Sequence, residues 1–455
     1  MFDALRGPRR VALLFLLLSG PPASSAATGA PAVPPRTLPA PSPRARKLEQ
    51  LGKRLGTREP QLENPCADPA ELPCTHTALS PFFASLDALA TGTASSPTVI
   101  AAFGNSLIAG DRIVDILRDE LSTTFGAGGR GVLFVDRLAP RTPRVRAGVA
   151  HGEWEPRTLG ELRAPELPLG LTGIYHRALT PRASSHFTLE GEPRGSVWWL
   201  DVPRAGRLVV RVEGHELARA EPEGSGQART LSFDLPAGAR TLDVVAENRD
   251  AVVLGVVLQR QGPGIVLDTL GVPSADANLF LRAREDFFRE ELAQRDPRLM
   301  LFILGGNEAK RLERGRARMD EVETGLSTFV RRARAAAPAS ACLVVGPIDA
   351  VRGGTDEHKL DPLPHLDEVI AMERRVALSE HCAFIDLYSA MGGKGSLARF
   401  YQAGLVLEDL VHPRGQGLDL LGQLLTNALL RAWVDSGTAG PQATLAPELQ
   451  HRESP

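Results

Sequence analysis

The apolar and polar positions of this chain first form a compact apolar run and then a helical stripe. Residues 98–103 are almost continuously apolar. Within residues 111–125, Ile113, Leu117 and Leu121 recur every fourth position, with charged residues between them. The run predicts a strand buried on both faces, and the stripe predicts an amphipathic helix that packs on a sheet. The first folding unit is therefore predicted to be strand, turn and helix.

The same alternation of strands and helices returns in the C-terminal half of the chain. Strands are predicted at 265–270, 299–304, 342–346 and 383–387, and helices at 278–293, 321–335, 366–379 and around Leu421, Leu425 and Leu429, with a short early helix at 79–89. This order predicts an α/β fold, a three-layer arrangement in which helices cover both faces of a parallel sheet. Sites in such sheets form at the carboxyl ends of the strands.

Between these regions, residues 144–262 change to a period of two. Short alternating segments at 196–202, 207–212 and 241–245 are separated by turns that contain Pro and Gly. The pattern is typical of an antiparallel sheet pair and predicts an inserted β-sandwich.

The two ends of the chain differ from the globular part. Residues 1–26 combine early arginines, a short apolar run and small residues, which is typical of a signal peptide and predicts a periplasmic or secreted protein. An uncleaved signal anchor is the alternative, and no later segment is apolar enough to predict a stable membrane span. Residues 27–78 and 437–455 predict a disordered Pro-rich linker and a disordered tail. The α/β core is then predicted to comprise residues 79–143 and 263–436.

The cysteines and the overall charge restrict the function classes. Cys66 and Cys74 lie close together in the linker, and Cys342 and Cys382 each open a predicted strand, so two disulfides are expected. A zinc site is the weaker alternative because the two distant pairs lack CxxC spacing. Charge is balanced, with 52 Lys and Arg against 54 Asp and Glu, so no net field would attract nucleic acid or an anionic membrane.

Ser106 is the first candidate for chemistry. It follows the first predicted strand through Gly104 and Asn105 and stands just before a helix. At that place a hydroxyl would lie at the carboxyl edge of the sheet, beside N–H groups that favour developing negative charge. On local grounds alone, an ordinary helix N-cap is the favoured interpretation of this serine.

Asp409 and His412 favour the interpretation of Ser106 as a nucleophile over that of a helix N-cap. An Asp three residues before a His in a turn can orient the imidazole through one ring nitrogen and leave the other to accept a proton from a serine. A surface loop pair is the alternative for these two residues alone. Their position before the last helix of the same predicted sheet favours a catalytic triad with Ser106.

Two further loops offer donors for an oxyanion. Asn307 follows Gly305 and Gly306 at the end of the strand 299–304, where its side-chain amide can reach a developing charge. Gly271 and Ser274 follow the strand 265–270, and either backbone N–H can serve, alongside that of Ser106. Taken singly, each loop is also compatible with an ordinary turn.

Three tryptophans fall in the inserted segment. Trp154, Trp198 and Trp199 are candidate stacking platforms for sugar rings. Because neighbouring residues of a strand point to opposite faces, one of Trp198 and Trp199 is expected in the core. The scattered histidines have no metal-ligand spacing, and neither a metal nor another cofactor is expected.

In this order, the segments 104–106, 271–275, 305–307 and 409–412 resemble the four blocks of the SGNH/GDSL hydrolase superfamily. With the β-rich insertion, the chain looks like the bacterial peptidoglycan O-acetylesterases. The resemblance implies a flavodoxin-like SGNH sheet and a carbohydrate-binding-like insertion. It also implies Ser106 as nucleophile, His412 as base, Asp409 as its orienting group, and oxyanion donors from Asn307 and the block around Gly271 and Ser274.

Three positions depart from the family pattern. Asn105 replaces the usual acidic residue before the serine, Leu107 replaces a usual His, and Ser274 stands at the usual glycine. The expected function is an exported serine ester hydrolase that removes acyl groups, acetyl above all, from a glycan such as peptidoglycan or another polysaccharide. An O-acyltransferase with the same triad and an inactive glycan-binding protein remain as alternatives.

Overall fold

The structure is a computed structural model that describes residues 35–68, 70–71, 73–137, 147–260, 262–352 and 360–438. The expected signal peptide and all but two residues of the expected C-terminal tail lie outside these residues. Among the residues within these ranges, no helix is long and apolar enough to cross a membrane.

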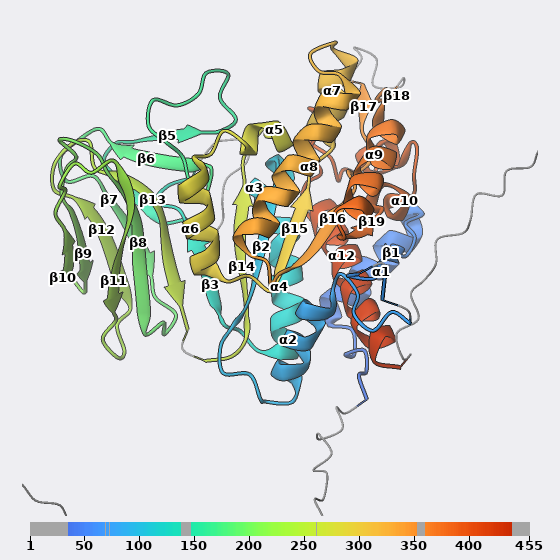
Figure 1. The fold of residues 1–455 in the computed structure, drawn as a ribbon, viewed down its shortest axis with the longest axis horizontal. Helices are drawn as coiled ribbons and strands as arrows, with labels where there is room; N and C mark the ends of the chain where they lie inside the picture. The colour runs from blue at the N-terminus through green and yellow to red at the C-terminus, as the bar shows by residue number, and fades with distance from the viewer. Residues whose placement is uncertain are drawn as a thin grey trace, which may run out of the picture. The chain divides into compact units, whose positions relative to one another are not determined.

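A six-stranded sheet forms the centre of the α/β part (Figure 1). Its order is β1-β19-β16-β15-β2-β14, with bounds β1 Leu62–Glu63, β2 Thr98–Gly104, β14 Ile265–Gly271, β15 Leu299–Ile303, β16 Ala341–Val345 and β19 Ala383–Ile385. All neighbours pair in parallel except β1, which adds to β19 in antiparallel fashion. The predicted parallel sheet is therefore present, and every residue of β2, β14, β15 and β16 is buried because helices cover both faces.

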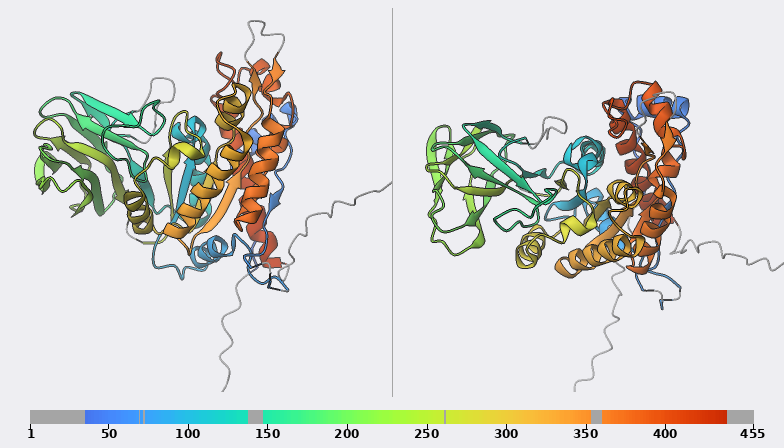
Figure 2. Two further views of the ribbon diagram at one scale, coloured as in Figure 1. Left: turned by 45° about the horizontal axis from the view of Figure 1, so that its top comes forward. Right: turned by 90° about the horizontal axis from the view of Figure 1, so that it is seen from above.

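Helices form a layer on each face of this sheet (Figure 2). The helices are α1 Pro43–Leu55, α2 Ser80–Ala90, α3 Ser106–Ala109, α4 Arg112–Phe125, α5 Ala277–Phe280, α6 Glu285–Arg295, α7 Gly306–Glu313, α8 Met319–Ala336, α9 Leu366–Ser379, α10 Leu387–Met391, α11 Ser396–Gln402 and α12 Gln416–Thr438. One apolar cluster joins α1, α2, α4 and α12 to the sheet, and a second joins α5, α6, α8 and α9. The short strands β17 Val351–Arg352 and β18 Asp361–Pro362 form a separate hairpin.

The predicted helix 278–293 is divided into α5 and α6. Arg284 precedes α6 in an extended conformation, and its N–H donates to Leu169 O at 2.8 Å. Its guanidinium lies 3.5 Å from the centroid of the Phe287 ring. These contacts with another segment outweigh the local helical pattern.

The N-terminal segment corrects the expectation of an unfolded linker over 27–78. In the part that the structure describes, Pro43 opens α1 and Ser42 caps it by accepting from the N–H of Ala45. Leu48, Leu51 and Leu55 are buried in the cluster that contains α12. The high proline content concealed this stripe at i, i+3 and i+7, which buries enough apolar surface to fold.

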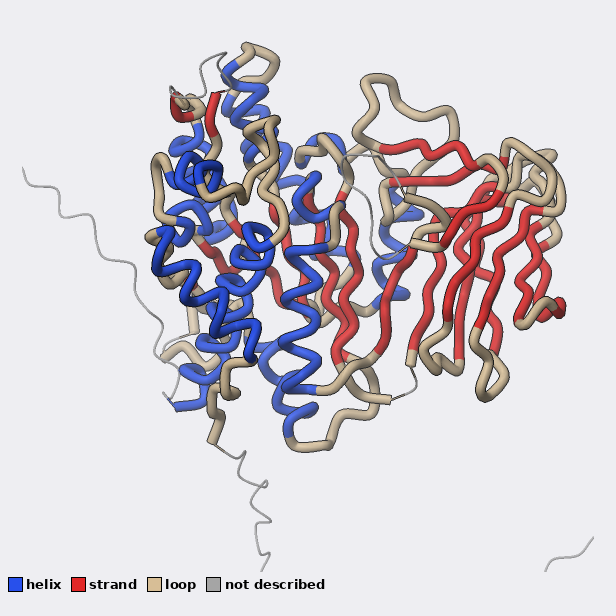
Figure 3. The backbone as a smooth tube through the Cα atoms, turned by 180° about the vertical axis from the view of Figure 1, so that it is seen from behind, coloured by secondary structure: helices blue, strands red, loops and turns tan. Residues whose placement is uncertain are grey.

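Two antiparallel sheets lie between β2 and β14 in the sequence, and Figure 3 shows them as the region built almost only of strands. The first, β10-β9-β12-β7-β4, comprises β4 Val149–His151, β7 Ser184–Thr188, β9 Leu208–Val212, β10 His215–Ala220 and β12 Thr241–Ala246. The second, β11-β8-β13-β6-β5 with β3 beside β13, comprises β3 Gly129–Leu133, β5 Trp154–Thr158, β6 Ile174–Ala178, β8 Arg194–Asp201, β11 Gln227–Asp234 and β13 Val252–Gln259. Because β3 precedes residue 144, the antiparallel region draws on residues before the predicted boundary.

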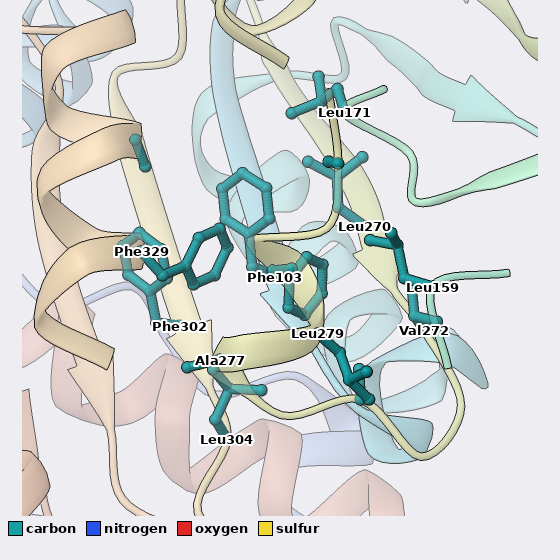
Figure 4. Packing of buried hydrophobic residues seen from close by; sticks show 14 of the residues in the cluster. Phe103, Leu159, Leu171, Leu270, Val272, Ala277, Leu279, Phe302, Leu304 and Phe329 are labelled. Atoms are coloured by element: carbon teal, nitrogen blue, oxygen red, sulfur yellow. The ribbon is translucent and has the colours of Figure 1, made fainter. Parts of the chain in front are cut away.

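Strands β8 and β13 of the second antiparallel sheet are buried over most of their length. Trp199 belongs to the cluster between the two antiparallel sheets, whereas Trp198 belongs to the cluster that contains Phe103 of β2. Figure 4 shows Phe103 near Leu159 and Leu171, two residues of the β5–β6 region. The core of the antiparallel region is therefore continuous with that of the α/β part.

Both expected disulfides are present, and they pair Cys66 with Cys74 and Cys342 with Cys382. The second joins the start of β16 to the residue before β19, which holds two neighbouring strands at one end of the sheet.

Candidate active site

Ser106 is placed by the end of β2. Asn105 caps the short helix α3, since its side chain accepts from the N–H of Leu107 at 3.0 Å. Gly104 allows the close turn, because a Cβ there would come within 2.3 Å of Ile108 Cγ1 and 2.8 Å of Ile303 O. Ser106 therefore stands at the carboxyl edge of the parallel sheet, at the first position of α3.

The structure brings Ser106, His412 and Asp409 together in one chain of contacts. Ser106 Oγ lies 2.8 Å from His412 Nε2. On the other side of the ring, His412 Nδ1 lies 2.7 Å from Asp409 Oδ2. These distances are those of a nucleophile, its base and the group that orients the base.

The loop before α12 holds Asp409 in place. Its Oδ1 accepts from the N–H groups of Val411 and His412, both at 3.0 Å. Partial burial opposes ionisation of Asp409, but hydrogen bonds from the His412 side chain and these N–H groups outweigh it and lower the pKa of Asp409. The carboxylate is thus ionised where it faces the imidazole.

Asn307 is the second residue of α7 and lines the same cavity as Ser106. Its Nδ2 donates to Ala275 O at 2.7 Å, which leaves the second amide proton for another acceptor. Gly305 precedes it with a φ of 87°, a conformation that favours glycine.

Gly271 and Ser274 occupy different positions in the block that follows β14. Gly271 is the last residue of β14 and is packed so closely that a Cβ would come within 2.3 Å of Ala109 N. Ser274 is exposed in the following turn with a φ of 62°. Neither is among the residues that line the cavity beside Ser106, whereas Asn307 is.

The cavity beside Ser106 is small, about 40 Å³. It is lined by Asn105, Ser106, Leu107, Leu304, Gly306, Asn307, Lys310, Pro347, Ile348, Asp349, Ala350, Val411 and His412. Sequence reasoning missed Lys310 and Asp349. The first had a signal, because Lys310 lies one helical turn after Asn307 and therefore on the same side of α7. Burial lowers the pKa of this lysine.

The three tryptophans do not form a sugar-binding surface, which corrects that expectation. Trp154, Trp198 and Trp199 are only 7 %, 2 % and 6 % exposed. Trp154 Nε1 also donates to Ser184 O at 3.2 Å. All three rings are used in packing, Trp154 and Trp199 in the cluster between the two antiparallel sheets and Trp198 in the cluster that contains Phe103.

Among the residues with a described position, no group of three or more His, Cys, Asp or Glu side chains is arranged to hold a metal ion.

Residues 235–420 match the model of the GDSL-like Lipase/Acylhydrolase family, a range that contains Asn307, Asp409 and His412 but not Ser106. No curated protein sequence matches the chain significantly.

Solved structures give further similarities. A peptidoglycan O-acetylesterase is 24 % identical, over 78 % of this chain and 96 % of that chain, with a TM-score of 0.66. A Bacillus subtilis protein is 14 % identical over 68 % and 99 % of the two chains, with a TM-score of 0.32. A family two carbohydrate esterase from Clostridium thermocellum is 12 % identical over 57 % and 95 %, with a TM-score of 0.28.

The first of these similarities supports the fold, and the family model supports the class of chemistry. Residues 235–420 therefore match a GDSL-like lipase/acylhydrolase domain, and this match together with the fold supports an ester hydrolase of the SGNH type.

Proposed function

We propose that the protein is an exported serine esterase that removes O-acyl groups, acetyl in particular, from a cell-envelope or extracellular glycan. The observation that carries the proposal is the chain of contacts from Ser106 Oγ to His412 Nε2 at 2.8 Å and from His412 Nδ1 to Asp409 Oδ2 at 2.7 Å. The small size of the adjacent cavity, about 40 Å³, suits a short acyl group.

The reaction follows from this geometry. Ser106 Oγ attacks the ester carbonyl while His412 Nε2 takes its proton, and Asp409 stabilises the imidazolium that forms. Asn307 Nδ2 and the backbone N–H of Ser106, with that of Ser274 or Gly271, donate to the oxyanion. When the tetrahedral intermediate collapses, His412 returns the proton to the leaving sugar hydroxyl and an acyl-enzyme remains.

The second half of the reaction uses the same groups. His412 Nε2 takes a proton from water, the resulting hydroxide equivalent attacks the acyl carbonyl, and the proton then returns to Ser106 Oγ as the carboxylic acid leaves. No redox step or external group is needed for this sequence.

The glycan and the export are proposals of the same kind. The description of the similar solved structure as a peptidoglycan O-acetylesterase suggests an acylated glycan, and both disulfides are compatible with an oxidising compartment. We assign the two antiparallel sheets to an inserted β-sandwich that helps to bind this glycan through surfaces other than its buried tryptophans.

The test is hydrolysis of a chromogenic acetyl ester by the protein, by Ser106→Ala and by the control Ser96→Ala, an exposed serine before β2. We expect Ser106→Ala to lose at least ~10³-fold in kcat and Ser96→Ala to keep the native rate. A fluorophosphonate should label Ser106. An unlabelled native protein, or equal rates in native protein and Ser106→Ala, would remove Ser106 from the mechanism.

A further inference from the structure

Glu308 is the third residue of α7 and contacts both segments that carry the proposed oxyanion donors, namely the N-terminus of α7 and the β14–α5 loop. Its side chain is 3 % exposed, and its two oxygens have different partners. Glu308 Oε2 accepts from the N–H of Gly305 at 2.9 Å, at the N-terminus of α7, which holds Asn307. Glu308 Oε1 accepts from the N–H of Ala277 at 3.1 Å, at the end of the loop that holds Ser274. One carboxylate therefore bridges the two segments.

Two other contacts join the same pair of segments. Asn307 Nδ2 donates to Ala275 O at 2.7 Å. Arg311 Nε pairs with Asp276 Oδ2 at 2.9 Å, while Asp276 Oδ1 accepts from the N–H of Leu279 at 2.8 Å. Helix α7 is thus connected to the β14–α5 loop through successive polar contacts, and both carboxylates among them, Glu308 and Asp276, are buried.

The position of Glu308 is costly in free energy. Burial, with the nearby Asp276 carboxylate as the second cause, raises the pKa of Glu308 to about 7. A neutral side chain of the same size would avoid that cost. The N–H groups of Gly305 and Ala277 are a physical reason for a carboxylate at this position, because each oxygen of Glu308 accepts from one of them.

Glu373 of α9 provides an internal comparison. It is also buried, and burial together with the nearby Glu308 raises its pKa well above the usual value. Its Oε2 has no hydrogen-bond partner among the described residues, and its Oε1 lies 2.8 Å from the position that a Cβ of Gly305 would take. Glu373 therefore packs against Gly305, and no hydrogen bond among the described residues joins it to the β14–α5 loop.

We propose that Glu308 is a positioning residue of the oxyanion site. Its carboxylate sets the separation between the N-terminus of α7, which carries Asn307, and the β14–α5 loop, which carries Ser274. The inference rests on the proposed function, because it assigns Glu308 to the geometry that this reaction requires. Glu308 does not touch the substrate and acts through the backbone of Gly305 and Ala277.

The test compares Glu308→Gln with the matched control Glu373→Gln. Glutamine keeps the size of Glu308 but accepts with one oxygen only and directs an NH2 group at the second N–H. We expect kcat to fall by ~10- to 100-fold with KM nearly unchanged, since a small misplacement of an oxyanion donor has this effect. Binding of an alkylboronate, whose adduct with Ser106 occupies the oxyanion site, should weaken by a similar factor. Glu373→Gln should stay within about twofold of native kcat, because the backbone N–H groups of Gly305 and Ala277 are bonded to Glu308 and not to Glu373.

A double-mutant cycle then separates positioning from general stability. If Glu308 acts through Asn307, adding Glu308→Gln to Asn307→Ala should cost little beyond Asn307→Ala alone, whereas full multiplication of the two losses would overturn the proposal. Native kcat and native boronate affinity in Glu308→Gln would also overturn it. Ser106→Ala is measured in parallel. If Ser106→Ala keeps native activity, the proposed function fails. If Ser106→Ala loses activity and Glu308→Gln keeps it, the proposed function stands and the positioning role of Glu308 fails.

One measurement does not depend on a folded variant. In the native protein the amides of Gly305 and Ala277 should exchange hydrogen slowly, because both are bonded to the buried Glu308 carboxylate. Exchange of both amides at the rate of an open loop would contradict the bridge, even if Glu308→Gln did not fold.

Discussion

Ser274 lies in the loop between β14 and α5 and has a left-handed backbone conformation, with a φ of 62°. A non-glycine residue is strained there, and the side chain is exposed, so it has no packing role. The proposed reaction can use the N–H of this residue, or that of Gly271, and does not use the Ser274 hydroxyl. The serine therefore tolerates a conformation that glycine adopts without strain.

We expect Ser274→Gly to raise the free energy of unfolding by up to ~1 kcal/mol and to leave kcat within about twofold of native. The gain is limited because glycine also loses more entropy on folding. Urea denaturation and ester hydrolysis measure the two quantities. Ser274→Ala is the control, with the same strain but no hydroxyl; a tenfold loss of activity in both variants would show that the hydroxyl takes part.

Asp409 is expected to act through the tautomer of His412. In Asp409→Asn, an amide NH2 would face His412 Nδ1, so the ring would carry its proton on Nε2 and could not accept one from Ser106. We expect kcat to fall by roughly 10⁴-fold, the scale of the same change in other triads, with little change in stability. The exposed neighbour Glu408 supplies the control Glu408→Gln. A loss below about tenfold in Asp409→Asn would mean that His412 does not depend on this carboxylate.

At the scale of elements, α6 connects the α/β part to the antiparallel region through buried charged groups. Arg295 pairs with Asp268 of β14 at 2.6 Å, and the same carboxylate accepts from the N–H of Val132 in β3 at 3.0 Å. One turn earlier, Glu291 Oε2 accepts from the N–H of Leu171 at 2.6 Å. Arg295 has a partner of opposite charge, whereas Glu291 Oε1 has no hydrogen-bond partner among the described residues.

Glu291 therefore makes stability depend on pH. Burial raises the pKa of Glu291 to about 7. The folded state then binds a proton more tightly than the unfolded state, so this contribution is complete at pH values below about 4.5 and is lost as the pH rises through about 7. We expect Glu291→Gln to raise the free energy of unfolding at pH 8 by ~1–3 kcal/mol and to change it little at pH 5. Urea denaturation at both pH values is the test, and lower stability of Glu291→Gln at pH 8 would contradict it.

At the scale of the molecule, the antiparallel region and the α/β part share one apolar core. Trp198, Leu200 and Val257 lie in the same cluster as Phe103 and Phe288. A segment that buries one of its sheets against the rest of the protein has no independent core on that side. Its stability should therefore be coupled to that of the catalytic part.

We expect Trp198→Ala to lower the free energy of unfolding by ~3–5 kcal/mol, and to shift the loss of esterase activity and the unfolding of the antiparallel strands together. Activity and circular dichroism, followed along one urea titration, provide the measurement. Val149→Ala, at an apolar side chain 61 % exposed in β4, is the control that should shift neither. Activity that persists after the strands have unfolded would show two independent units.

Several helices and strands of this protein could be predicted from the local pattern of apolar and polar residues. The apolar run 98–103 and the stripe of Ile113, Leu117 and Leu121 became β2 and α4 because both signals depend only on which neighbours lie on one face. The order of strand ends along the chain also placed Ser106, Asn307 and the Asp409–His412 turn at one edge, since parallel strands present their carboxyl ends together.

Other features depended on which segment packs against which, and this was decided only in three dimensions. Trp154, Trp198 and Trp199 had the same composition signal as sugar-binding tryptophans, but distant partners buried them. Trp154 and Trp199 pack between the two antiparallel sheets, and Trp198 packs in the cluster that contains Phe103 and the helices α5, α6, α8 and α9. The helix of 43–55 became stable only where α12 covers it. The bridge of Glu308 joins two loops about thirty residues apart, 277 and 308, and no spacing rule along the chain predicts such a contact. The periodicity of the sequence determines which residues share one face of a helix or strand, whereas the tertiary structure determines which segment packs against that face.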